Sequence, residues 1–463
     1  MAVTKNFYIK VLTPVHIGCD EVYDPLSFVV DEVKKELVVF APIPFFKALS
    51  DHEKERLCEI CKKGTISSIL EVMKFIRGKK AEGVKVRVSE GFLQHYNQKL
   101  AMGLKDERRI QQELNRFEIK RTAFNPIDNK PIIPGSSVKG AIRTAYLNHL
   151  AKKRPDIKSN PEDKKANKKL EQNLLNYDER EIHTDPFRLI KVSDFMPVKA
   201  STRIVYAVNE KKIPDNKMAR GLSQILEIIE PDSLFVGTIS IDENKDHHPL
   251  IKHPLTLLEA LNSLEFYARE KKREEEELKD AGLNPCPLIF GKGHPLRIGH
   301  HSGAESVTIE GHRRIDIKRK KGKYVSDKAT TVWLASEVYR NYDKNKLLPF
   351  GWALLWEVDF VAEDIEKKGE KEVYNTASAE TAPTKPFASI HEEWSSALLT
   401  WNPGSQELKV MWEGKSATHK GKEIIPEDMR KDLVERKKSV KARVMVQKVY
   451  NMYKIVNIEK GCD

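Results

Sequence analysis

A turn that leads into a helix contains the residues of this chain best suited to phosphate chemistry. Pro134 ends an apolar strand, and the residues after it suit a helix that continues to about Leu150. A serine can cap such a helix, and the free N–H groups of its first turn form an anion site. Lys139 and Arg143 are four residues apart, which predicts two cations on one helical face beside that site. The candidate binding residues are Gly135, Ser136, Ser137, Lys139 and Arg143.

The same segment is not a nucleotide-binding P-loop. Gly135 and Gly140 have the spacing of that motif, but Ala141 stands where the motif requires lysine. On the residues alone, two interpretations remain open. The segment is either a phosphate-binding helix terminus or an ordinary capped helix whose Lys139 and Arg143 face solvent.

A second glycine-rich stretch, residues 291–303, has a composition suited to contact with nucleic acid. Glycines let a backbone approach a ligand closely, arginine can donate two hydrogen bonds to a phosphate, and histidines can stack on bases. The alternative is a flexible loop without a ligand. The candidate residues are Arg297, Gly299, His300, His301, Ser302 and Gly303.

His16 follows Pro14 at the end of the first predicted strand. A histidine there can act as a general base toward an RNA 2′-hydroxyl without a metal. The alternative is a histidine that packs against the turn or contacts RNA without taking part in chemistry. Both interpretations remain open at the level of the residues.

No metal site or cofactor is expected. Neighbouring residues on a strand point to opposite faces, so an adjacent pair such as His300–His301 is a poor chelate. Cys58 and Cys61 have the spacing of half a zinc site, but the sequence holds no second such pair. We therefore expect free or structural thiols.

Alternation of strand and helix patterns predicts that an α+β fold with a mainly antiparallel sheet positions these residues. Strands are predicted at 6–12, 26–30, 36–40, 84–88, 116–122, 201–208, 223–229 and 234–241. Helices are predicted at 45–61, at 66–76 and from 257 to 280.

Three further segments differ in composition. Residues 151–182 are charged and poor in large apolar side chains, which predicts a surface insertion. Residues 361–388 combine charged residues with Thr, Ala and Pro and are predicted to be a linker. Residues 389–463 have a β pattern of their own, for which a small barrel of the OB or S1 type is the expected form.

Composition limits the class of protein and its partners. A chain of 463 residues should hold two or three domains, and its net charge of +12 favours a polyanionic partner. The apolar runs are too short to span a membrane, and the first ten residues contain no apolar signal region. We expect a cytoplasmic protein without a membrane partner.

Five segments resemble the RAMP superfamily, the RNA-binding subunits of CRISPR effector complexes, and together they cover roughly residues 5–356. The stretch IPGSSVKGAIRTA, Ile133–Ala145, resembles the superfamily signature. Within the superfamily, Leu12–Gly18 is most similar to the fifth-subunit family of type III-A Csm complexes. Leu12–Gly18 is part of the opening segment Phe7–Gly18. Three further segments fall in that family's order: Phe187–Asp194, Leu296–Gly299 with Ser302–Gly303, and Pro349–Trp352.

The resemblance implies a fold of tandem ferredoxin-like (RRM-like) units. The first unit is expected at 1–150 and the second, with its glycine-rich loop, at 183–360. The charged insertion separates them, and the small β-rich domain at 389–463 follows the linker.

The resemblance also implies a function. A protein of this kind caps the backbone of a type III-A Csm complex at the 3′ end of the guide RNA and assists maturation of that RNA in antiviral defence. Its expected partners are guide RNA, the other Csm subunits (chiefly the repeated backbone RAMP subunit) and host nucleases. A non-catalytic subunit is expected, with His16 among the RNA contacts. The alternative is a metal-independent RAMP endoribonuclease that processes repeat RNA.

Overall fold

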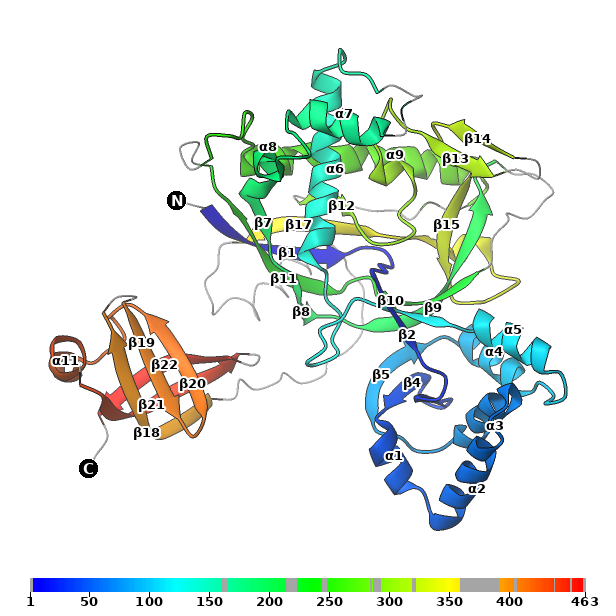
Figure 1. Cartoon of the computed structure of the whole chain (residues 1–463), viewed down its shortest axis with the longest axis horizontal. Helices are drawn as coiled ribbons and strands as arrows, with labels where there is room; N and C mark the ends of the chain where they lie inside the picture. Colours follow the sequence, from blue (N-terminus) through cyan, green and yellow to red (C-terminus); the bar gives the residue numbers. More distant parts are fainter. Residues whose placement is uncertain are drawn as a thin grey trace. The chain divides into compact units, whose positions relative to one another are not determined.

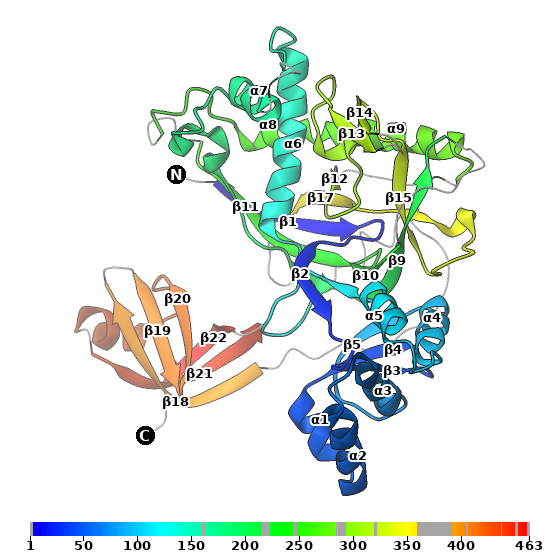
Figure 2. The ribbon, with the colours of Figure 1, turned by 45° about the vertical axis from the view of Figure 1, so that its right-hand side comes forward.

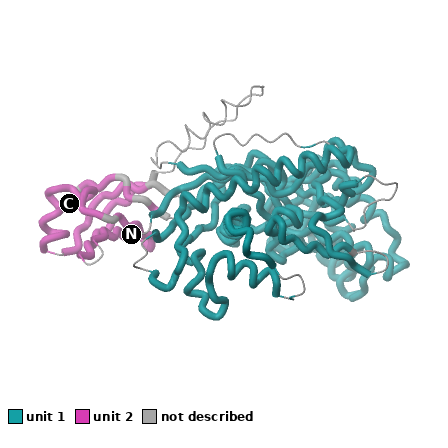
Figure 3. Tube along the Cα trace, turned by 90° about the horizontal axis from the view of Figure 1, so that it is seen from above, with its two compact units in different colours: residues 1–362 teal, residues 363–463 magenta. Residues whose placement is uncertain are grey.

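The computed structural model describes residues 3–159, 163, 165–213, 223–243, 248–283, 285, 293–318, 322–358, 391–403, 406–436, 438–449 and 452–460. Its contacts divide the chain into two compact units, residues 1–362 and 363–463 (Figure 3). The predicted linker, residues 361–388, lies outside the described residues, as do Gly291 and Lys292 of the second glycine-rich stretch.

The first sheet of unit 1 has six strands and β1 at its centre. β1 pairs antiparallel with β11 on one side and with β17 on the other. Buried Phe7, Ile9 and Val11 alternate along β1, as the apolar pattern of the segment predicts. The strands are, in spatial order, β12 (His294–Arg297), β17 (Trp352–Val358), β1 (Val3–Val11), β11 (Leu234–Ile241) and β7 (Ile190–Val192), with β8 (Met196–Lys199) also paired to β11.

The second sheet has nine strands, most of them antiparallel. Among the described residues, only β10 with β6 and β5 with β9 pair in parallel in this sheet. The α+β class predicted from the sequence is therefore confirmed. The strands of this sheet are, in spatial order, β2 (Gly18–Tyr23), β6 (Ile119–Thr122), β10 (Gln224–Ile229), β9 (Thr202–Lys211), β5 (Gly83–Val88), β4 (Glu36–Phe40) and β3 (Phe28–Asp31), with β15 (Thr331–Ser336) on β9 and β16 (Leu348–Pro349) on β15.

The predicted division of the chain at residue 150 does not coincide with the division between the sheets. Each sheet contains strands from before residue 150 and strands from after residue 183. β1 and β2 are consecutive in sequence, yet they belong to different sheets. Long-range pairing of this kind cannot be deduced from local patterns, which show strands but not their neighbours.

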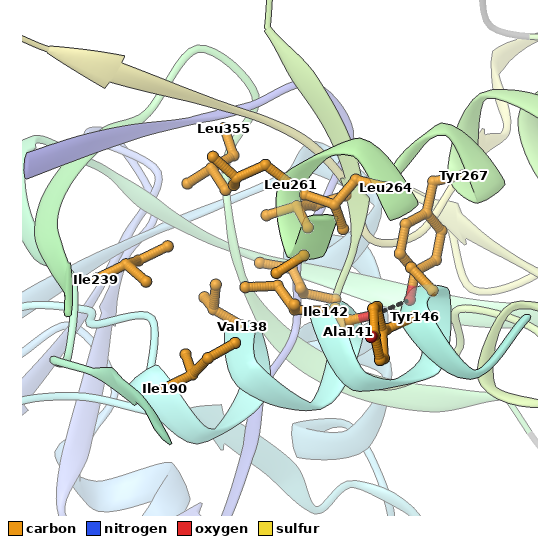
Figure 4. Close-up of a cluster of buried hydrophobic side chains, with 14 of the residues drawn as sticks. Val138, Ala141, Ile142, Tyr146, Ile190, Ile239, Leu261, Leu264, Tyr267 and Leu355 are labelled. Carbon is orange, nitrogen blue, oxygen red and sulfur yellow. Dashed lines mark hydrogen bonds between the residues drawn. The ribbon is translucent and has the colours of Figure 1, made fainter. Parts of the chain in front are cut away.

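Helix α6 crosses the face of the first sheet (Figures 1 and 2). Its buried residues recur every three or four positions, which is the spacing of one helical face. Figure 4 shows this face packed on strands and helices from distant parts of the chain: Val138, Ala141, Ile142, Ile190, Ile239, Leu261 and Leu355. The helices of unit 1 are α1 (Pro42–Ala48), α2 (Asp51–Lys62), α3 (Ile66–Ile76), α4 (Glu90–Leu100), α5 (Glu107–Arg116), α6 (Gly135–Lys153), α7 (Ala166–Leu175), α8 (Leu257–Ser263) and α9 (Glu265–Asp280). A short hairpin, β13 (Ile315–Lys318) and β14 (Lys323–Ser326), forms a separate two-stranded sheet.

The charged segment 151–182 is not merely a surface insertion. It contains α7, whose Leu170, Leu174 and Leu175 are buried in the same core as α6. The prediction failed because three leucines at helical spacing were outweighed by the many charged residues around them, which occupy the opposite face.

Unit 2 is a closed barrel (Figure 1). If its five strands are numbered in chain order, their order around the barrel is one, two, three, five, four. A short helix follows the third strand in the sequence. This is the arrangement of an OB-fold, so the expectation of a small β-rich barrel is confirmed. Its elements are β18 (His391–Asn402), β19 (Glu407–Trp412), β20 (Lys415–Lys420), α11 (Glu427–Arg430), β21 (Val440–Val449) and β22 (Met452–Lys460).

Among the described residues, no helix combines the length and the apolar character needed to cross a membrane.

Candidate nucleic-acid interface

The two glycine-rich segments singled out in the sequence meet at one cavity of unit 1. The cavity has a volume of about 460 Å³. One wall is the first turns of α6, and another is the loop that follows β12. Its lining residues are Ile17, Gly18, Ser137, Gly140, Ala141, Thr144, Tyr267, Arg297, Ile298, Gly299, His300 and Val307.

Backbone contacts hold the loop after β12 against the end of the segment that carries His16. The His300 N–H donates to the His16 carbonyl oxygen at 2.7 Å. Gly299 has a φ of +82°, and a Cβ there would lie 2.5 Å from the same oxygen. Glycine is therefore required at position 299, because any side chain would push the loop away from the segment that carries His16.

The N-terminus of α6 differs from the sequence-based prediction. Pro134 occupies the N-cap position, and no side chain caps the helix, so the prediction of a Ser136 or Ser137 cap is wrong. The Gly135 N–H instead donates to Asp194 Oδ1 at 2.8 Å. A carboxylate of the protein thus already occupies part of the anion site that the sequence predicted.

Gly135 itself serves close packing. A Cβ at Gly135 would lie 2.3 Å from the Val192 carbonyl oxygen and 2.6 Å from that of Ser193. We expect Gly135→Ala to lower the free energy of unfolding by about 1–3 kcal/mol, because backbone atoms must move apart. Chemical denaturation measures the change. Gly140→Ala in the same helix is the control: no atom lies within 4 Å of its Cβ position, and it should be neutral or stabilising by about 1 kcal/mol. Equal effects of the two variants would contradict this assignment.

Lys139 and Arg143 are not on the cavity wall, and neither faces solvent as a free cation. Lys139 Nζ donates to the Ile190 carbonyl oxygen at 2.8 Å. Arg143 pairs with Glu171 and with Asp185, the latter at 3.0 Å. The interpretation as two free solvent-facing cations is therefore wrong: the two side chains hold α6 against neighbouring segments, and their contact with RNA stays a prediction.

Arg297 is also engaged inside the protein. Its side chain is 1% exposed, and its Nη2 lies 2.5 Å from Glu274 Oε1. Its Nε donates to the Phe350 carbonyl oxygen at 3.2 Å, and the guanidinium lies 4.7 Å from the centre of the Trp352 ring. Arg297 lines the cavity, but its guanidinium is engaged by partners within the protein, so its main contribution is to support the cavity wall, and its predicted phosphate contact stays a prediction.

The three candidate histidines differ in exposure. His16 is 2% exposed and its Nδ1 donates to the Glu227 carbonyl oxygen at 2.8 Å. Burial lowers the pKa of His16 to about 4, against an opposing effect of that hydrogen bond, and burial lowers the pKa of His301 to about 3. His301 packs on Trp333, whereas His300 is exposed and lines the cavity.

Ser302 and Gly303 shape the loop after β12. The Ser302 hydroxyl donates to the Gly299 carbonyl oxygen at 2.6 Å and is buried. Gly303 is exposed with a φ of +84°. Neither residue lines the cavity, so their contribution is to the course of the loop.

Sequence reasoning missed part of the cavity wall. Gly140, Ala141 and Thr144 continue the helical face of the predicted Ser137 and are all small, a signal that the basic residues between them obscured. Gly18, Tyr267 and Val307 reach the cavity from three other segments, and no local pattern predicts that.

The cavity offers backbone, hydroxyl and imidazole groups. Ser137 and Thr144 carry hydroxyls, and His300 carries an exposed ring that can stack on a base. A Cβ at Gly18 would lie 3.8 Å from both His16 Nε2 and His300 Nδ1, so the glycine keeps the space beside the two rings open. Within the described ranges, no three His, Cys, Asp or Glu side chains are grouped so as to hold a metal ion.

Comparison with known proteins gives one family match. The model of the RAMP superfamily matches residues 8–379. A curated relative, the CRISPR system protein Csm5 of Methanocaldococcus jannaschii, is 27% identical over 213 residues. That match covers 44% of this chain and 46% of the relative, so it spans about half of the relative's length.

Two solved structures match this chain over about three quarters of its length. A chain in the cryo-EM structure of a Csm–crRNA–target RNA ternary complex of a type III-A CRISPR-Cas system matches with a TM-score of 0.50 and 19% identity. The match covers 76% of this chain and all of that one. The crystal structure of Csm5 from T. onnurineus matches with a TM-score of 0.43 and 18% identity, over 75% of this chain and 99% of that one.

Proposed function

This chain belongs to the RAMP superfamily, and from that premise we propose that it is an RNA-binding subunit of a type III-A CRISPR Csm complex. In this proposal it caps the backbone of repeated RAMP subunits at the 3′ end of the guide RNA. It also assists maturation of that end in antiviral defence by positioning a separate nuclease. The Csm5 name of the curated relative and the complex that contains the structural neighbour support this choice.

The observation that carries the proposal is the meeting of the two glycine-rich segments at one cavity. Gly140 in α6 is exposed on one wall, and on the other wall the exposed ring of His300 lies beside exposed Gly18 at the start of β2. Small residues on both walls let a ribose–phosphate backbone come close to the protein main chain. Hydroxyl groups on one side and an imidazole on the other suit an unstacked nucleotide of single-stranded RNA.

Binding at this cavity is expected to depend little on base sequence. The groups that line it are main-chain atoms, hydroxyls and an imidazole, which recognise sugar and phosphate in any nucleotide. Arg297 forms an ion pair within the protein, so the long-range attraction of RNA must come from other exposed basic residues. Lys120 is one of them, since it is exposed and close enough to His16 to influence its charge.

Gly140→Glu tests the cavity without disturbing the fold. Nothing lies within 4 Å of a Cβ at Gly140, so the new side chain fits and places a carboxylate at the rim. Repulsion of about 1–4 kcal/mol is expected between this carboxylate and a phosphate nearby. We therefore expect the affinity for single-stranded guide RNA to fall at least about fivefold, as measured by fluorescence anisotropy.

Gly103→Glu is the matched control, because Gly103 is also exposed with open space around its Cβ position and lies far along the chain from the cavity lining. Unchanged RNA affinity for both variants would rule out the cavity as an RNA site. Equal losses would mean that net charge alone matters.

The capping role needs its own test. Co-purification of the tagged wild-type chain from its host should yield guide RNA of defined length together with other Csm subunits. An isolated chain that carries cleaved repeat fragments would favour the endoribonuclease alternative instead. In that case, cleavage of repeat RNA in EDTA should disappear in His16→Ala.

A further inference from the structure

The C-terminal barrel presents a sheet face that none of the preceding observations explains. In OB-folds, the outer face of the second and third strands is where single-stranded oligonucleotides bind. The corresponding strands here are β19 and β20, with β18 as their neighbour. Leu408 and Val410 of β19 point into the barrel and are fully buried, so the residues between them face outward.

Two large apolar side chains are exposed side by side on this face. Leu398 on β18 and Met411 on β19 are cross-strand partners and are 39% and 45% exposed. No described helix or loop of the barrel covers them. Exposed apolar side chains on a sheet face provide a surface on which unstacked bases can lie.

Lysines flank this apolar pair. Lys441 on β21 is the cross-strand partner of Leu398, and Lys409 lies on the same face of β19 as Met411, two residues away. Both are exposed, and in the described part of the barrel no carboxylate lies within ion-pair distance of either.

Other basic residues of the barrel behave differently. Arg443 pairs with Glu393 at 3.0 Å, Lys415 with Glu392 at 2.7 Å, and Arg436 with Asp432 at 3.1 Å. Lys431 and Lys438 near the barrel helix are also exposed, but among the described lysines only Lys409 and Lys441 flank the exposed apolar pair. A ligand complementary to this face carries repeated negative charge and flat apolar groups, which is the chemistry of a single-stranded nucleic acid.

We propose that the outer face of β18, β19 and β20, together with Lys441, binds single-stranded RNA. The lysines contact phosphates, Leu398 and Met411 contact base faces, and the hydroxyls of Thr400, Ser416 and Thr418 are available to ribose. This surface is separate from the cavity of unit 1. Because both units belong to one chain, an RNA bound by one unit is presented to the other at a high effective concentration.

The test uses the full chain and a fluorescein-labelled, unstructured RNA of about 20 nucleotides, longer than the roughly 4–16 nucleotides that one OB-fold covers. Lys409→Ala/Lys441→Ala is compared with Lys431→Ala/Lys438→Ala, which removes the same charge from exposed positions around the helix of the barrel. Anisotropy titrations at several salt concentrations should show a logarithmic salt slope that is smaller by about 1.4 for the first pair, as two lost phosphate contacts predict.

A second variant tests the apolar part of the face. Leu398→Ser/Met411→Ser should weaken RNA binding several-fold at every salt concentration, with the salt slope unchanged. All variants are also made in the Gly140→Glu chain, so that failure at the cavity and failure at the barrel are seen separately. With 4-thiouridine in the RNA, crosslinks are expected to peptides from β18–β20.

Three results would overturn the proposal. The first is an unchanged salt slope in Lys409→Ala/Lys441→Ala. The second is a set of crosslinks confined to unit 1. The third is loss of co-purified protein subunits from the barrel variants while RNA affinity stays at the wild-type value, which would identify the face as a protein interface.

Discussion

Arg297→Ala is expected to lower the free energy of unfolding by about 3–5 kcal/mol. The substitution leaves the Glu274 carboxylate buried, with the Trp352 Nε1–H at 2.7 Å but without its counterion. A buried charge without a partner is among the costliest defects that one substitution can create. Denaturant unfolding monitored by tryptophan fluorescence measures the loss, because Trp352 lies at the affected site.

Two comparisons make this result specific. Arg297→Met/Glu274→Met removes both charges and should recover most of the lost stability, since two apolar side chains of similar size replace the pair. Arg436→Ala breaks an exposed ion pair in the barrel and should cost less than about 1 kcal/mol. If Arg297→Ala instead unfolded like the wild type and lost RNA affinity, Arg297 would be a phosphate donor, as the sequence alone suggested.

Acidification is expected to destabilise unit 1 between pH 6.5 and 4, by about 3 kcal/mol through His16 alone. Burial lowers the pKa of His16 from 6.5 to about 4 in the folded chain. Between these values the unfolded chain binds a proton that the folded chain does not. Stability therefore rises with pH through this window and is lost as pH falls. Burial lowers the pKa of His95 to about 4 and that of His301 to about 3, which adds to the same trend.

His16→Asn isolates the contribution of this histidine. The asparagine amide can reproduce the donor at Nδ1 and keep the hydrogen bond to the Glu227 carbonyl oxygen, but it does not titrate. As pH is lowered from 6.5 to 4, the free energy of unfolding of the His16→Asn variant should fall less steeply than that of the wild type. Parallel slopes for wild type and His16→Asn would contradict the assignment of the lowered pKa to His16.

The same burial bears on catalysis. At neutral pH His16 is uncharged, and its Nδ1–H is committed to a main-chain oxygen. Its position beneath the cavity fits a role in fixing the course of the chain between β1 and β2. A lysine or tyrosine partner for acid–base chemistry would have to reach a ring that is 2% exposed. The cleavage experiment with His16→Ala is therefore chiefly a check on the alternative function.

Local sequence determined the elements and the location of the candidate site. Periodic apolar residues marked β1 and the long helix α6, and turn residues marked the hairpin of β3 and β4. Glycine-rich segments around Gly135 and Gly299 marked both walls of the cavity, because close backbone approach restricts those positions to glycine.

Only the tertiary structure decided what the charged residues do. Lys139, Arg143 and Arg297 look like phosphate ligands in the sequence, but each has a partner contributed by a distant segment: Ile190, Glu171 with Asp185, and Glu274. Whether a cation is free depends on which acceptors the fold brings within a few ångströms of it. Spacing along one helix carries no information about acceptors on another.

The barrel of unit 2 shows the same difference between local sequence pattern and long-range contacts. The β pattern of residues 389–463 predicted a small barrel, but the exposed row of Lys441, Leu398 and Met411 exists only because three strands pair in one register. Most of the predicted strands and helices, and the positions that must be glycine, could be read from the sequence, since these depend on local conformation. Strand neighbours, ion-pair partners and the cavity were decided by the tertiary structure, since these depend on contacts between residues far apart in the chain.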